Sequence, residues 1–184
     1  MKSTDYVLNW SAKLEIYFEL VQTKNLLLRT PENEDAWAVF VIHSDPETNR
    51  YNPSGPMKNL NEATKSLQEW IQDWENNGFG YWSVLDSSTC EIIGVGGIRR
   101  MHYNGRDVLN LYYRFSPKSW GRGYATELAR TAVNLAGRYL PGLPIVARIR
   151  PSNVASIRVA EKAGLKHTHE LYTSEYVVLT LGWR

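Results

Sequence analysis

The sequence of 184 residues lacks the features that mark secreted, membrane-spanning or cysteine-rich metal proteins. Its only cysteine, Cys90, excludes an internal disulfide framework and a cysteine-based zinc site. No run of about 18 apolar residues is present, so we expect no membrane-spanning helix and no membrane partner. The residues after Met1 also lack the apolar segment of a secretory signal. The expected compartment is therefore the cytoplasm.

The chain also lacks a large excess of charge of one sign. The net charge is +2 and the Lys and Arg residues are scattered, which gives no indication of a nucleic-acid partner. Length and an apolar content of 43% fit one domain over residues 1–184. Seven Trp and eleven Tyr residues would suit a homodimer face.

The first half of the chain predicts a strand and two helices. A short strand over 26–29 stops at Thr30-Pro31, and apolar residues at helical spacing predict a helix over 32–42. Residues 43–58 contain three prolines and read as a long exposed loop. A second helix follows from an N-cap pair at Asn59 and Glu62 to a C-cap at Gly78, with Trp70 and Trp74 on its core face.

The second half begins with strands and then alternates. Strands over 81–85, 91–99 and 109–115 form an antiparallel meander, with Asn104-Gly105 as the hairpin turn. A long helix over 125–140, a strand over 145–149 and a helix over 153–163 follow. Strands over 165–171 and 175–181 close the chain, and His167 and His169 would share a face of the first. This order predicts a mixed sheet with helices on both faces.

The most informative stretch runs from Phe115 to Thr126. It leaves a strand, passes Gly121 and Gly123 and enters the long helix. The first turn of a helix has N–H groups without intrahelical partners and the positive end of the macrodipole. Glycines there allow an anion to approach closely, and Arg122 adds a positive charge. The pattern therefore predicts a phosphate site.

Other interpretations of this stretch stay open on its residues alone. The two glycines could serve only a tight strand-to-helix turn, or the turn could bind a phosphate ester of another kind. It lacks the Gly-Lys-Ser/Thr ending of a nucleoside-triphosphate loop and the third glycine of a dinucleotide fingerprint. Magnesium-dependent phosphoryl transfer is therefore not expected, and no metal ligand set is indicated.

Two motifs in the right order resemble the GNAT superfamily of N-acetyltransferases. The family's turn is Gln/Arg-x-x-Gly-x-Gly/Ala, and residues 120–125 are similar to it with Trp120 at the first position. Residues 153–165 resemble Asn-x-x-Ser-x-x-x-x-Glu-Lys-x-Gly-Phe of the ribosomal-protein N-terminal acetyltransferase branch, with Leu165 in place of Phe. The resemblance covers about residues 23 to 171, and residues 1–22 find no counterpart in it, which implies an N-terminal extension. It implies a single α/β (α+β) domain with a mixed, mostly antiparallel, twisted sheet.

The resemblance also implies acetyl-CoA as co-substrate and assigns its site. Main-chain amides from Gly121 to Thr126 would hold the pyrophosphate, Asn153 would bond the pantetheine arm, and Ser156 would lie near the thioester sulfur. Asn153 could equally be an ordinary N-cap, and Ser156 an exposed residue of the first helical turn. The expected cofactor residues are Tyr113, Arg114, Phe115, Gly121, Arg122, Gly123, Tyr124, Ala125, Thr126, Asn153 and Ser156.

Two positions that handle protons in relatives differ here. Asn110 stands where the branch tends to place a glutamate, and Ala160 stands where many relatives have a tyrosine acid. Ser156 and Asn110 are therefore the candidate catalytic positions, with Ser156 either donating a proton to the departing sulfur or only bonding CoA. Two hypotheses follow: transfer of acetyl to a primary amine, either a protein N-terminus or a small molecule, or a catalytically degenerate CoA-binding regulator. We expect the 43–58 loop to shape the acceptor pocket.

Overall fold

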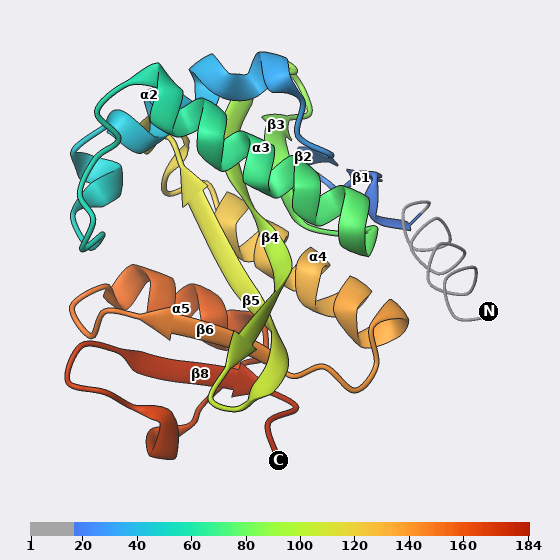
Figure 1. Ribbon diagram of the computed structural model, residues 1–184, viewed down its shortest axis with the longest axis vertical. Coiled ribbons are helices and arrows are strands. Elements are labelled where there is room, and N and C mark those ends of the chain that lie inside the picture. Colours follow the sequence, from blue (N-terminus) through green and yellow to red (C-terminus); the bar gives the residue numbers. More distant parts are fainter. Residues whose placement is uncertain (1–16) are drawn as a thin grey trace, which may run out of the picture.

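The computed structural model describes residues 17–184, so most of the predicted N-terminal extension lies outside the described residues. Figure 1 shows a single twisted sheet with helices on both faces. The strand order is β1-β2-β3-β4-β5-β6-β8-β7, and only the β5–β6 pair is parallel. The strands are β1 (Leu20–Gln22), β2 (Leu26–Arg29), β3 (Tyr81–Asp86), β4 (Ile92–Tyr103), β5 (Arg106–Phe115), β6 (Ile145–Ile149), β7 (Lys166–His167) and β8 (Val177–Leu181).

The helices fall into two pairs of α-helices and four single turns of 3-10 helix. The α-helices are α2 (Ala36–Ser44), α3 (Leu60–Asn77), α4 (Tyr124–Tyr139) and α5 (Val154–Lys162). The 3-10 turns are η1 (Asn33–Asp35), η2 (Glu47–Asn49), η3 (Pro117–Ser119) and η4 (His169–Leu171). Helices α2 and α3 cover one face of the sheet, and α4 and α5 cover the other.

Local signals in the sequence account for the clearest boundaries. The Asn59 side chain accepts a hydrogen bond from the Glu62 N–H at 3.1 Å, and Gly78 ends α3 in the left-handed conformation with φ 71°. Asn104 and Gly105 both have positive φ, 49° and 81°, as a two-residue hairpin between β4 and β5 requires. The predicted meander β3–β4–β5 is therefore confirmed, with its strands extended to the hairpin.

The core divides along the two faces of the sheet. The α4–α5 side packs around Trp82, Ile98 and Leu128, all fully buried. The α2–α3 side packs around Val39, Leu67 and Val95, with Trp70 buried beside them. The predicted core role of the α3 aromatic stripe is confirmed, since Trp70 and Trp74 expose only 7% and 3% of their surface.

The sheet opens where β5 meets β6. Strand β5 pairs with β4 along its whole length but with β6 only at Leu109 and Asn110. Beyond these residues β5 and β6 diverge, as Figure 1 shows, toward the side from which α4 and α5 begin. This opening lies next to the predicted phosphate turn and provides the space for a site.

Three sequence-based boundaries were wrong. The predicted 165–171 strand shrinks to β7, because η4 begins at His169, directly after the Thr168 N–H bonds the Val178 carbonyl of β8 at 2.9 Å. His169 is therefore not on a strand with His167, although their rings stack with centroids 5.9 Å apart. The predicted 32–42 helix divides into η1 and α2. The 43–58 segment is not an exposed loop throughout, since α2 extends to Ser44 and Asn49 of η2 is buried.

Candidate active site

The phosphate turn presents a row of main-chain donors. Gly121 and Gly123 adopt φ of 77° and 81°, and Gly123 is the residue immediately before α4. The first helical bond runs from the Glu127 N–H to the Gly123 carbonyl at 3.0 Å. The N–H groups of residues 121–126 donate no hydrogen bond within residues 17–184. They are therefore available to a ligand that accepts several hydrogen bonds at once.

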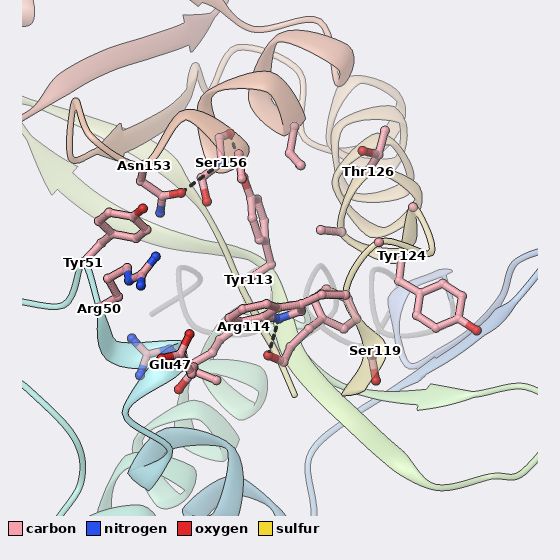
Figure 2. A pocket seen from close by; sticks show the side chains of 18 residues that line it. Glu47, Arg50, Tyr51, Tyr113, Arg114, Ser119, Tyr124, Thr126, Asn153 and Ser156 are labelled. Carbon is pink, nitrogen blue, oxygen red and sulfur yellow. Dashed lines mark hydrogen bonds between the residues drawn. The ribbon is translucent and has the colours of Figure 1, made fainter. Parts of the chain in front are cut away.

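These residues line a cavity of about 470 Å³, drawn in Figure 2. Every cofactor residue predicted from the sequence lines it except Arg122, and Asn110 is also absent from its wall. The opposite wall comes from the 43–58 segment, with Arg50 and Tyr51 facing Asn153 in the view of Figure 2. The lining residues are Glu47, Thr48, Arg50, Tyr51, Tyr113, Arg114, Phe115, Ser119, Trp120, Gly121, Gly123, Tyr124, Ala125, Thr126, Asn153, Ala155, Ser156 and Val159.

The opened edge of β5 supplies a second set of main-chain groups. The Leu109 N–H bonds the Pro144 carbonyl beside β6, whereas the Ser116 N–H bonds Ile93 on the β4 side. Because main-chain groups alternate sides along a strand, those of Tyr113 and Phe115 face the opening and those of Arg114 face β4. The Phe115 carbonyl accepts from the Trp120 indole N–H at 2.9 Å. Arg114 therefore reaches the cavity with its side chain and not with its main chain.

The start of α5 completes this cavity. The Asn153 Oδ1 accepts from the Ser156 N–H at 3.1 Å, which makes Asn153 an N-cap and leaves its amide nitrogen without a bond among residues 17–184. The Ser156 carbonyl accepts from the Tyr113 hydroxyl at 3.0 Å, as Figure 2 shows. Burial raises the pKa of the Tyr113 phenol, so it stays a neutral donor. The Ser156 hydroxyl has no partner within the described residues and remains available for chemistry.

Two side chains of the turn anchor it to the sheet. The Glu127 carboxylate accepts from the Thr23 hydroxyl at 2.6 Å and from both the main-chain and side-chain nitrogens of Asn25 at 2.8 Å. Burial raises the pKa of Glu127, but the hydrogen bonds from Asn25 and Thr23 outweigh it and the net shift is downward. The Tyr124 hydroxyl donates to Asp86 at 3.0 Å. These anchors escaped sequence reasoning because their partners lie far apart in the chain.

Asp86 is itself a firm anchor point. It accepts hydrogen bonds from the Ser88 hydroxyl at 2.6 Å and the Ser88 N–H at 2.9 Å. These bonds, with the one from Tyr124, lower the pKa of Asp86 to about 2. The carboxylate therefore stays charged at neutral pH, and the β3–β4 turn and the start of α4 are held together.

A second cavity of about 360 Å³ lies on the α2–α3 side and shares the Arg114 side chain with the first. The 43–58 segment forms much of its wall, between Asn52 and Met57. The lining residues are His43, Asn52, Ser54, Gly55, Pro56, Met57, Glu62, Lys65, Ser66, Glu69 and Arg114. The two cavities thus meet at Arg114.

His43 is a neutral part of this second cavity. Its Nδ1 lies 2.9 Å from the Val39 carbonyl, which can only accept, so Nδ1 carries the proton. Its Nε2 then accepts from the Tyr112 hydroxyl at 3.1 Å. Burial, assisted by the positive charge of Arg114, lowers the pKa of His43 to about 4. The ring is therefore uncharged at neutral pH. A lone histidine before a proline-rich loop gave no sequence signal for this role.

Asn110 and Ala160 stand at the two positions that handle protons in relatives, and the side chains of both are unreactive. The Asn110 amide donates to the Tyr81 hydroxyl at 2.5 Å and lines neither cavity. Ala160 is fully buried in the α5 packing. Neither side chain can accept or donate a proton to a substrate. A dedicated general base is therefore absent from both positions.

Within residues 17–184, no three His, Cys, Asp or Glu side chains are grouped so that they could hold a metal ion. In the same range, no helix combines the length and apolar character needed to cross a membrane.

Comparisons with known proteins converge on one description. The model of the acetyltransferase (GNAT) domain family matches residues 25–166. The uncharacterized protein YkkB of Bacillus subtilis (strain 168) is 30% identical over 151 residues, which cover 79% of this chain and 84% of YkkB.

Two solved structures share the fold. An acetyltransferase from Agrobacterium tumefaciens str. C58 superposes with a TM-score of 0.76 at 23% identity, over 89% of this chain and 94% of that one. Spermidine N-acetyltransferase from Vibrio cholerae, solved with CoA and spermine, superposes with a TM-score of 0.69 at 17% identity. The superposition covers 86% of this chain and 96% of that one.

Proposed function

The chain belongs to the GNAT acetyltransferase family, and from this premise we propose that it transfers acetyl from acetyl-CoA to a primary amine in a ternary complex. The family membership makes it an acyltransferase enzyme. The observation that carries the proposal is the row of unpaired N–H groups at residues 121–126 on the wall of a cavity that continues along the opened edge of β5. A linear cofactor with a pyrophosphate at one end and a thioester at the other suits this shape.

The proposed contacts follow the cavity from one end to the other. The pyrophosphate accepts hydrogen bonds from the amides of residues 121–126, and the pantetheine arm runs along the edge of β5 near Tyr113. The amide nitrogen of Asn153, left free by its capping bond, bonds the arm. Arg122 does not line the cavity, so its contribution is limited to long-range attraction of the anionic cofactor.

The proposed chemistry is direct attack. The amine nitrogen bonds to the thioester carbon, the tetrahedral oxyanion collapses, and the carbon–sulfur bond breaks. The amine loses one proton and the CoA sulfur gains one. A free main-chain N–H of β5 stabilises the oxyanion, a contribution of typically about 3 kcal/mol per donor. Ser156 is the proposed donor to the sulfur, because its hydroxyl has no other partner among residues 17–184.

Deprotonation of the amine does not need a side-chain base. The α-amine of a protein N-terminus has a reference pKa of about 8 and an alkyl amine such as that of lysine about 10.4, so the neutral fraction at physiological pH is useful for the first and small for the second. Water in the acceptor cavity can take the remaining proton. The side chain of Asn110 is bonded to Tyr81 and stays a structural neighbour of the reaction.

A second candidate function is a CoA-binding regulator without turnover. Asn110 and Ala160 favour it, since neither can handle a proton. Release of CoA thiol from acetyl-CoA across a panel of primary amines separates the two: turnover of any acceptor excludes the regulator. A cytoplasmic location and a homodimer stay predictions from the sequence.

A further inference from the structure

The side chain of Arg114 is a cation without a carboxylate partner at the junction of the two cavities. It is half-buried and lines both of them. No Asp or Glu oxygen within residues 17–184 forms an ion pair with it, whereas Arg29 pairs with Asp35 at 2.6 Å. A charged group that is partly removed from water normally has an opposite charge nearby. Residues 17–184 therefore leave the position of an opposite charge beside Arg114 open, which suits an anionic ligand.

The guanidinium is held in place by a neutral group. Its Nη1 donates to the Asn49 Oδ1 at 2.7 Å, and the Asn49 amide donates to the carbonyls of His43 and Asp45. Asn49 is buried, with 6% of its surface exposed, so this contact fixes the position of Arg114 and leaves its charge uncompensated. The remaining N–H groups have no partner among the described residues. A fixed guanidinium of this kind binds a planar carboxylate well.

Glu47 and Arg50 line the first cavity with Arg114 and carry opposite charges, and within residues 17–184 Glu47 forms no ion pair with Arg114. His43 in the second cavity is neutral, because burial and the Arg114 charge lower its pKa to about 4, and its ring nitrogens bond Val39 and Tyr112. The charged residues of α3 that line this cavity, Glu62, Lys65 and Glu69, are exposed and carry both signs. A polyamine would place a second positive charge against Arg114. An acceptor with one ammonium and one carboxylate would not.

We infer that the acceptor is a small primary amine that also carries a carboxylate, and that Arg114 binds this carboxylate and determines the choice of acceptor. This inference rests on the proposed function, because it names the acceptor class for the same reaction. The anionic cofactor is the other conceivable partner. The Arg114 side chain also lines the first cavity, but the phosphates have the free amides of residues 121–126 as donors, whereas the guanidinium bonds Asn49 in the 43–58 segment.

The test is a comparison of acids with their amides. Purified full-length enzyme is assayed for thiol release with ω-amino acids from glycine to 6-aminohexanoate, each paired with its amide, and with putrescine and spermidine. Rates are compared at equal concentrations of free amine. We expect at least one acid to exceed its amide roughly tenfold in kcat/KM, the effect of one charge-assisted contact of about 1.4 kcal/mol. The polyamines should be poorer than that acid.

Variants tie this preference to Arg114. Arg114→Gln should bring the ratio of acid to amide close to one, and Arg114→Lys should retain part of it because the charge remains. Lys166→Gln is the matched control: it removes one positive charge from the exposed strand β7, which lines neither cavity, and should keep the full ratio. Melting temperatures show that each variant is folded.

The outcomes separate this inference from the proposed function. Turnover with equal rates for acids and amides, or with a polyamine as best acceptor, overturns the inference and leaves the transferase standing. The inference also fails if Arg114→Gln raises the KM for acetyl-CoA and leaves the acid preference intact. If no amine is turned over, the transferase fails. Calorimetric titration of the same acids into the protein–CoA complex then tests whether Arg114 binds their carboxylate. Equal affinities for wild type and Arg114→Gln overturn the inference.

Discussion

The two ends of the active site are built in different ways. The cofactor end uses main-chain N–H groups at the start of α4, held by the bonds of Glu127 and Tyr124 to distant turns. The proposed acceptor end is lined by side chains, above all Arg114, which is held by a single amide of the 43–58 segment. Under the proposed function, the backbone would bind the substrate common to the family, whereas side chains that can change without disturbing the fold would bind the acceptor.

The strongest test of this contrast is Gly123→Val at the cofactor end. A β-branched residue is strained at φ 81°, so the chain would rotate this peptide away from the cavity. We expect CoA affinity to fall roughly 100-fold, about 3 kcal/mol, by calorimetry.

Gly142→Val is the matched control for that variant. Gly142 has φ 94°, and a Cβ there would also meet nothing within 4 Å, but it lies outside the cavity in the α4–β6 connection. It should lose stability and keep CoA affinity within about twofold. Equal losses of affinity in the two variants would show that strain alone, and not the cradle, explains the effect.

The acceptor end should respond to pH through His43. The unfolded chain protonates this residue near its ordinary pKa of 6.5, whereas the folded protein keeps it neutral down to a pKa of about 4. Unfolding therefore takes up a proton between these values, and stability falls as the pH drops through this window. Between pH 7 and pH 5, the protonation of His43 in the unfolded chain should lower the free energy of unfolding by about 2 kcal/mol.

His43→Gln should lose this pH dependence of the free energy of unfolding, which urea unfolding at the two pH values would measure. Arg114→Gln should reduce it, because the Arg114 charge helps to lower the His43 pKa. An unchanged pH dependence in His43→Gln would mean that the histidine is not the neutral floor of the acceptor cavity.

Ser156→Ala probes the junction of the two ends. If the hydroxyl donates a proton to the departing sulfur, kcat should fall about tenfold with the affinity for CoA unchanged, since thiolate is already a fair leaving group. A residue that only bonds CoA would instead raise the Kd and spare kcat. Single-turnover rates and calorimetry together distinguish the two roles.

The smallest expected effect comes from the Glu127 anchor. Glu127→Gln removes the charge that accepts from Thr23 and Asn25 and should weaken CoA binding about fivefold, a loss near 1 kcal/mol. Glu170→Gln, an exposed change in η4, is the control and should leave CoA affinity as it is. Equal CoA affinity in Glu127→Gln would show that the cradle needs no anchor.

What the sequence predicted well depends on local physics. The α3 caps, the Asn104-Gly105 hairpin and the glycine turn each follow from residues that are neighbours in the chain. The family resemblance then assigned Asn153 and Ser156 to the same site as Gly123. In the structure, all three residues line one cavity.

What the sequence did not predict depends on distant pairs. Arg114 and Asn49 are 65 positions apart, and Glu127 and Asn25 are 102 apart. The short β7 also escaped, because the chain turns into η4 at His169, where the Leu171 N–H bonds the Thr168 carbonyl at 3.0 Å, a turn that strand periodicity cannot show.

The most direct test of the account is the binding of CoA followed residue by residue. Titration of 15N-labelled protein with CoA and, separately, with pantetheine would report on the amides of residues 121–126. The account predicts large shifts at these amides with CoA, small ones with pantetheine, and much tighter binding of CoA. No binding at high micromolar CoA, or the same shifts and affinity with pantetheine, would contradict it.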